Sequence, residues 1–331
     1  MSVSPNDVLE QQLLNDPAGA DFPLPLSATF YPLGFPLHLE TNSPDVLAAA
    51  SENWGHFSPA FTEAAARIRL AVSESDTMLS PTRSVFRSSG HLMSMFADQE
   101  NFMVLDFSQR FAFGWVTRAV ASDHPLLRYR FLTAAATMLV EQIALAPLHG
   151  ALIAREGCGV MLCGESCGGK STLSYACARA GWTFVSDDGT FLVRNRSDRY
   201  AIGNPYSLRL REDALRFFPE LAGQLAVVRP NGKVAVELFT RELPVRTALG
   251  SSIEHIVFLD RKDSGGVHLR PYNQHFAARE FERFCSFGTT DVRAAQKGCY
   301  QRLLSAGLWE LRYARLDDAI VRLEELADTG G

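Results

Sequence analysis

A chain of 331 residues exceeds the usual size of a single domain, so we expect two domains that share one cleft. Hydrophobic residues make up 47% of the chain and charged residues 21%, a composition that excludes a disordered protein and indicates a full core. The net charge is −5, and lysine and arginine are scattered without a basic run, so nucleic acid is not expected as a partner.

The first residues of the chain lack the basic and apolar regions of a signal peptide. The longest apolar stretch, 133–154, is interrupted by Glu141, Gln142 and His149, and therefore cannot cross a bilayer unaided. These features predict a cytoplasmic protein without a membrane partner.

Six cysteines occur, and none of them forms a CxxC pair. Without a secretory signal or thiolates at metal-ligand spacing, neither a disulfide framework nor a zinc site is expected. Four cysteines cluster around one glycine-rich segment, and we expect them to be buried, reduced and apolar in character: Cys158, Cys163, Cys167 and Cys177.

The N-terminal part is predicted to be a small β-rich α+β domain. Residues 1–22 are polar and mixed, and are expected to form a loosely docked arm. A helix is expected after Ser43 or Asp45 as its cap, with Pro44 in the first turn. Alternating or apolar segments predict short strands within 23–40 and at 65–72, 91–96, 101–107 and 111–117.

A long amphipathic helix is predicted over 126–146, where apolar residues recur at helical spacing. We place the domain boundary just before it, which gives domains of residues 1–125 and 126–331. His149 would then end the helix and open the next strand. Strands at 150–154 and 159–163, a glycine loop, a helix at 170–180 and a strand at 182–185 are expected to follow in this order.

Further elements complete the second domain. They are a strand at 255–260, helical segments within 277–306, a strand at 308–314 and a C-terminal helix. The order of strand, glycine loop, helix and strand predicts an α/β domain.

The glycine loop matches the pattern G-x-x-x-x-G-K-[ST] of phosphate loops. Its glycines let backbone N–H groups approach a polyphosphate, the following helix adds its positive end, and a lysine adds a mobile charge. A structural turn is the alternative, but an apolar strand before the loop and a helix after it favour phosphate binding. The nucleotide-binding residues predicted on this basis are Gly164, Glu165, Ser166, Cys167, Gly168, Gly169, Lys170, Ser171 and Thr172.

An acid pair, Asp187–Asp188, ends the strand after the loop helix. A solvated turn is the alternative reading of such a pair. Beside a phosphate loop, one carboxylate could hold metal-bound water while the other accepts the proton of an attacking hydroxyl. We predict Ser171 as a Mg²⁺ ligand, and which of the two acids would take which role is left open at this point. His149 alone would be read as a structural residue.

Together these segments resemble the core of the HPr kinase/phosphorylase superfamily, in particular its divergent HPr-kinase-related branch. The resemblance is carried by His149–Gly150, by the glycine loop on the second strand, and by Asp187–Asp188 about 23 residues after Gly164. It covers roughly forty residues strongly. It implies a phosphate-loop kinase domain similar to the phosphoenolpyruvate carboxykinase core, with ATP and Mg²⁺ as cofactors.

The resemblance also implies residue roles. Lys170 would contact the phosphates, Ser171 would hold Mg²⁺, and Asp188 would accept the proton of the substrate hydroxyl. Asp187, as a second Mg²⁺ ligand, and His149 would complete the catalytic site. This chain departs from the family pattern in two segments, near 205–210 and 243–250. In these segments only Arg209 and Arg246 remain as candidate substrate-binding residues. Glu212 or Asp213 would have to replace the metal-binding glutamate of the first segment.

These departures favour an acceptor other than the HPr protein. The sequence thus predicts a kinase that transfers the γ-phosphoryl group of Mg·ATP to a hydroxyl of a peptide, protein or small molecule. The alternatives are an ATP-binding regulatory or assembly module without transfer to an acceptor, and a decarboxylating kinase, for which metal ligands and arginines are missing. The sequence leaves open whether the chain forms a homo-oligomer.

Overall fold

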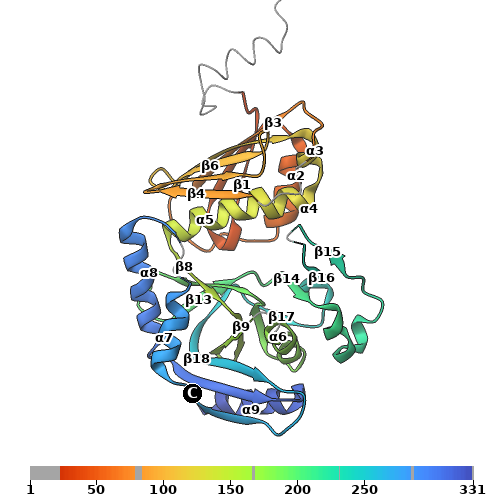
Figure 1. Ribbon diagram of the computed structural model, residues 1–331, viewed down its shortest axis with the longest axis vertical. Coiled ribbons are helices and arrows are strands. Elements are labelled where there is room, and N and C mark those ends of the chain that lie inside the picture. Colours follow the sequence, from red (N-terminus) through yellow and green to blue (C-terminus); the bar gives the residue numbers. More distant parts are fainter. Residues whose placement is uncertain (1–22, 79–83, 166–167, 231, 285–286, 330–331) are drawn as a thin grey trace, which may run out of the picture. The chain divides into compact units, whose positions relative to one another are not determined.

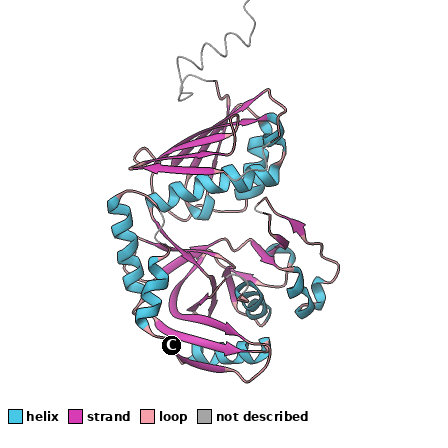
Figure 2. Ribbon diagram, in the orientation of Figure 1, coloured by secondary structure: helices cyan, strands magenta, loops and turns pink. Residues whose placement is uncertain are grey.

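A computed structural model describes residues 23–78, 84–165, 168–230, 232–284 and 287–329 (Figure 1). The predicted arm at residues 1–22 lies outside these residues. The chain divides into two compact units, Met1–Ile143 and Ala144–Gly331. Each unit combines strands with helices (Figure 2), so the fold is mixed α/β.

The first unit contains a seven-stranded sheet in the order β1-β2-β3-β7-β6-β5-β4. Its middle strands β2, β3 and β7 run parallel, and the other neighbours are antiparallel. Six strands fall where alternation predicts them, and β4 was not predicted. The strands are β1 Leu26–Phe30, β2 Leu37–Thr41, β3 Ala66–Ser73, β4 Val85–Ser89, β5 Leu92–Phe96, β6 Phe102–Asp106 and β7 Phe111–Thr117.

Helices cover one face of this sheet. The predicted helix after Ser43 is α2, Pro44–Trp54, and it is followed later by α3, Arg118–Ser122. The predicted long helix is divided into α4 His124–Leu127, the π-helical η2 Arg128–Thr133, and α5 Ala134–Ile143. In Figure 1, α5 lies along the sheet, where it contacts β3, β6 and β7.

Because α5 packs on the first sheet, the division between the units falls after this helix and not before residue 126. The predicted helix also extended too far. Residues Leu145–His149 form strand β8, which pairs antiparallel with β12, Gly189–Val193. His149 therefore ends a strand, in register with Gly189, and does not end a helix.

The second unit has a larger sheet with the strand order β17-β11-β9-β10-β18-β13-β12-β8, and β20 pairs with β18 and with β19. The strand β18 is long because its first residues pair with β13 and the rest pair with β10 and β20. The remaining strands are β9 Ala151–Arg155, β10 Cys158–Cys163, β11 Thr183–Ser186, β13 Tyr200–Gly203, β17 Arg246–Thr247, β18 Gly250–Arg261, β19 His268–Pro271 and β20 Gly307–Tyr313.

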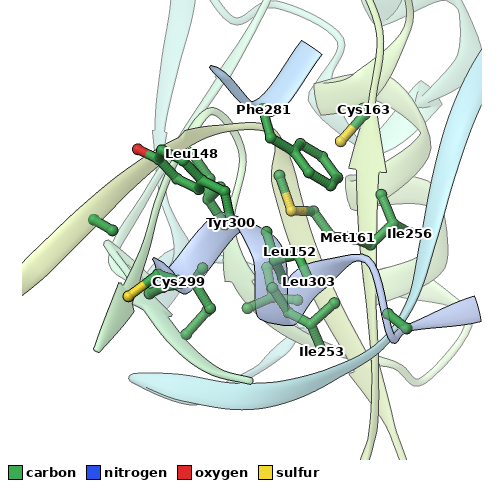
Figure 3. Close-up of a cluster of buried hydrophobic side chains, with 14 of the residues drawn as sticks. Leu148, Leu152, Met161, Cys163, Ile253, Ile256, Phe281, Cys299, Tyr300 and Leu303 are labelled. Carbon is green, nitrogen blue, oxygen red and sulfur yellow. The ribbon is translucent and has the colours of Figure 1, made fainter. Parts of the chain in front are cut away.

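Helices pack on both faces of this sheet. One face is buried by α6, Lys170–Arg179, and α9, Leu316–Asp328. The other is buried by α7, Gln274–Glu282, and α8, Thr290–Leu303, whose side chains Phe281, Tyr300 and Leu303 pack with residues of β9, β10 and β18 (Figure 3). The apolar strand β10 is buried on both faces, as expected for a central strand.

A small three-stranded sheet and short helical turns pack beside α6. These elements are β14 Ser207–Leu210, β15 Val227–Val228, β16 Val234–Phe239, η3 Glu212–Phe217, η4 Pro219–Leu221 and η5 Thr240–Glu242.

Candidate functional site

Strand order brings the predicted site residues of the second unit to one edge of its sheet. Strand β9 is antiparallel to both β10 and β11, so β10 and β11 run in the same direction with β9 between them. Their carboxyl ends therefore meet the start of β9 at the same edge, with β10 and β11 about 10 Å apart. This edge carries the glycine loop after β10, the acid pair after β11, and His149–Gly150 before β9.

The glycine loop leads from Cys163, the last residue of β10, to the first turn of α6. Gly169 precedes the helix with φ 92°, in the left-handed region that favours glycine. The first turn of α6 contains Ser171 and Thr172 and no acidic side chain, so this turn itself carries no negative charge to offset the positive end of the helix dipole. Ser166 and Cys167, also predicted to bind the nucleotide, lie outside the described residues.

The side chain of Lys170 folds back onto the loop. Its Nζ donates hydrogen bonds to the carbonyl oxygens of Gly164, at 2.9 Å, and Glu165, at 3.0 Å. The residue is only 6% exposed. The Glu165 carbonyl also accepts the N–H of Gly168 at 3.0 Å, so the described part of the loop is held by its own backbone and by the lysine.

The side chains of Asp188 and His149 contact each other at this edge. The distance from His149 Nδ1 to Asp188 Oδ1 is 3.2 Å, and the two side chains are 50% and 60% exposed. The backbone ties the two segments together, because the N–H of Gly150 donates to the Asp188 carbonyl at 2.9 Å. An exposed carboxylate with an imidazole beside it can accept a proton from a bound hydroxyl.

Asp187 has a different environment from its neighbour. It is only 6% exposed, and its Oδ2 accepts the backbone N–H of Arg209 at 2.8 Å. Burial raises the pKa of Asp187, although the nearby Arg209 charge and this hydrogen bond act in the opposite direction. A buried carboxylate whose charge is poorly compensated is a good ligand for a cation.

The two predicted substrate-binding arginines have different positions. Arg209 lies on β14 with its backbone against Asp187, while its Nε pairs with Glu237 at 3.1 Å. Arg246 donates to the carbonyl of Gly181, beyond the carboxyl end of α6, and is in register with Thr183 at the start of β11. The ten residues of α6 separate that point from the glycine loop by about 15 Å. The structure therefore does not bring Arg246 to the site.

The candidates for the missing metal-binding glutamate are also on the surface. Glu212 is exposed, and Asp213 pairs with Arg211 at 3.4 Å. In the part of the chain that the structure describes, no three His, Cys, Asp or Glu side chains gather in a way that could hold a metal ion.

Two residues that the sequence motifs did not indicate lie at the same edge. A Cβ atom built on Gly169 would be 2.8 Å from the hydroxyl of Tyr313 and 3.6 Å from Cδ of Arg261. Both residues end strands that run parallel to β10. The only sequence signal for Arg261 was its position as a basic residue directly after the strand predicted at 255–260. No sequence signal pointed to Tyr313 as a site residue.

A cavity of about 460 Å³ follows β18 and is lined by residues 262–266, His268 and Arg312. Arg312 precedes Tyr313 on β20, so the two side chains point to opposite faces of the sheet. The cavity therefore lies on the other side of the sheet from the Tyr313–Gly169 contact and contains none of the predicted site residues.

None of the helices within the described ranges is both long and apolar enough to span a membrane.

Comparison with known proteins adds little to this description. No family model matches the chain, and no curated protein matches its sequence. Among solved structures, the HPr(Ser) kinase/phosphatase from Coxiella burnetii is 12% identical, with 56% of this chain and 99% of that chain covered and a TM-score of 0.28. This is a weak structural relation, and at that level of similarity it carries no argument about function.

Proposed function

We propose that this protein is a phosphate-loop kinase that binds Mg·ATP and transfers its γ-phosphoryl group to a hydroxyl. The observation that carries the proposal is the glycine loop itself. A buried strand runs into a loop whose lysine is held on loop carbonyls at the acid-free N-terminus of a helix. Backbone N–H groups, a helix N-terminus and an ammonium group together suit a polyphosphate.

The chain offers groups for the phosphates and for Mg²⁺. The loop N–H groups and Lys170 would hold the phosphates. The Ser171 hydroxyl and the Asp187 carboxylate are oxygen donors of the kind that Mg²⁺ prefers, and Mg²⁺ in such sites takes its other ligands from phosphates and water. When bound, Mg·ATP supplies the phosphoryl group.

Proton transfer would fall to Asp188. Its exposed carboxylate can accept the proton of an acceptor hydroxyl, and His149 Nδ1, 3.2 Å away, can orient the carboxylate. Asp187 is buried and engaged with the Arg209 backbone, which suits it to hold a cation and not to exchange protons with a substrate. The two acids of one pair thus have separate roles.

The acceptor is proposed only as a class, a serine or threonine of a peptide or protein, or a small alcohol. Arg209, beside Asp187, is the candidate contact for an anionic group of this acceptor.

The test is transfer of label from Mg·[γ-³²P]ATP to a panel of hydroxy amino acids, sugars and peptides. Parent protein is compared with Asp188→Asn, Lys170→Ala and the control Asp198→Asn. Like Asp188, Asp198 is an acid with a basic neighbour, here Arg196 where Asp188 has His149, but it follows β12 at the end of that strand opposite to Gly189. Asp188→Asn should reduce transfer by roughly 100-fold or more while ATP still binds. Lys170→Ala should weaken both ATP binding and phosphoryl transfer.

Equal transfer by Asp188→Asn and the parent would refute the role of Asp188 as the base. ATP binding without labelling of any acceptor or release of phosphate would favour the regulatory ATP-binding module instead. A parent protein that binds no ATP would refute the whole proposal.

A further inference from the structure

The side of the glycine loop opposite to the acid pair is also built of functional groups. Strands β10, β18 and β20 run parallel, so β18 and β20 end at the same edge as the loop. Their last residues, Arg261 and Tyr313, are in register with each other. Neighbours in register on parallel strands point to the same face, which here is the face covered by α6 and α9.

The hydroxyl of Tyr313 lies against the glycine loop and forms no hydrogen bond with the described part of the chain. The residue is 1% exposed, and its hydroxyl has no hydrogen-bond partner among the described residues. The hydroxyl lies where a methyl group on Gly169 would collide with it, 2.8 Å from that Cβ position. A buried hydroxyl without a partner costs about 1–3 kcal/mol, and phenylalanine would fill the same space without this cost.

The Tyr313 hydroxyl can only act as a hydrogen-bond group and not as an anion. Burial raises its pKa to about 12, although the neighbouring Arg261 charge opposes this shift. At neutral pH the phenol therefore keeps its proton and can donate it to an oxygen of a ligand.

Arg261 carries a positive charge that no carboxylate in the described part of the chain neutralises. Its guanidinium lies 5.1 Å from the centre of the Phe217 ring, which supports it from one side. The preceding residue, Asp260, points to the other face of the strand and pairs there with Lys262 at 2.7 Å and Arg312 at 3.2 Å. The unneutralised arginine thus stands beside the positive N-terminus of α6.

We propose that Arg261 and Tyr313 form a second wall of the polyphosphate site. Arg261 pairs with a phosphate oxygen of the bound nucleoside triphosphate, and the Tyr313 hydroxyl donates a hydrogen bond to the same phosphate. The pairing uses the planar fork of arginine, which matches phosphate geometry. This inference rests on the proposed function and adds to it the side of the site that no sequence motif contains.

The experiment measures dissociation constants for Mg·ATP and for inorganic tripolyphosphate by calorimetry. It compares the parent with Arg261→Met, Tyr313→Phe and the control Arg246→Met, which removes an arginine at the far end of α6. Arg261→Met should weaken binding of both ligands about 10-fold or more, the range for one charge-assisted hydrogen bond. Tyr313→Phe should weaken both about three- to ten-fold, and Arg246→Met should match the parent.

Circular dichroism of each variant ensures that a loss of affinity is not a loss of folding. Affinities of Arg261→Met and Tyr313→Phe equal to that of the parent would overturn this inference and leave the kinase proposal intact. A loss for ATP without a loss for tripolyphosphate would also overturn it, because the two side chains would then contact the nucleoside. A parent that binds neither ligand would overturn both proposals.

Discussion

Replacing Gly169 by alanine tests the geometry of the glycine loop directly. The residue has φ 92°, and a Cβ there would lie 2.8 Å from the Tyr313 hydroxyl. Tyr313 cannot swing away easily, because its ring is packed in the core between the sheet and α9. The substitution therefore combines backbone strain with a collision against a buried side chain.

The two contributions can be separated by their magnitudes. A left-handed conformation costs alanine about 1–2 kcal/mol more than glycine. Forcing a methyl group into packed surroundings adds about 1–3 kcal/mol. Tyr313→Phe removes the oxygen that the new methyl group would meet, so in that background only the backbone cost should remain. We expect the loss of stability caused by Gly169→Ala to be smaller by about 1 kcal/mol or more when residue 313 is phenylalanine.

The measurement is urea unfolding of the full chain for the parent, both single variants and the double variant. A protein of two units need not unfold in a single step. Hydrogen exchange of the peptide that contains α6 therefore assigns the change to the second unit. Equal losses from Gly169→Ala in the tyrosine and phenylalanine backgrounds would refute the contact between Tyr313 and the loop, and would remove a main support of the proposed second wall.

Three further predictions concern other residues of the second unit. Asp187→Asn should stabilise the protein at neutral pH. Burial raises the pKa of Asp187, so the folded parent binds the proton of this carboxyl group more tightly than the unfolded chain does. The parent therefore loses stability as the pH rises above 3.8, the ordinary pKa of an aspartate. Urea midpoints from pH 4 to 8 would contradict this if the parent gained stability relative to the variant with rising pH. Arg246→Met should cost about 1 kcal/mol or less, through its bond to the Gly181 carbonyl, in thermal melts; a loss above about 3 kcal/mol would indicate a larger role. Burial raises the pKa of the Cys163 thiol to about 12. We therefore expect Cys163 to resist labelling by iodoacetamide at pH 8 until the protein is unfolded, which mass spectrometry can measure. Labelling of Cys163 in the native protein would contradict its burial.

Local sequence patterns predicted much of each unit correctly. The strands β9, β10 and β11 and the helix α6 occur where apolar runs, glycines and helix-forming residues indicate them. These elements depend mainly on residues that are neighbours in the chain, so periodicity and turn residues are sufficient to identify them. The glycine loop was recognisable for the same reason.

The errors arose where contacts distant in sequence decide the structure. Residues Leu145–His149 continue an apolar helical pattern, yet they form β8 because they pair with β12. Pro147 in this segment was a local sign that the helix had ended. Helix α5 belongs to the first unit because of its contacts with β3, β6 and β7, which no local pattern predicts. Arg246 was predicted to bind substrate from its position along the chain. However, β17 pairs with the start of β11, whereas the acid pair follows the end of β11.

The sequence by itself determined the loop, its lysine and the acid pair, because each depends on short spacings within one continuous strand–loop–helix–strand segment. Only the tertiary structure decided that Asp187 is buried while Asp188 pairs with His149, because the backbone of β14 contacts one acid and the end of β8 meets the other. It also decided that Arg261 and Tyr313 stand beside Gly169. Those two residues come from the ends of parallel strands, and the order and register of parallel strands are set by pairing between distant segments.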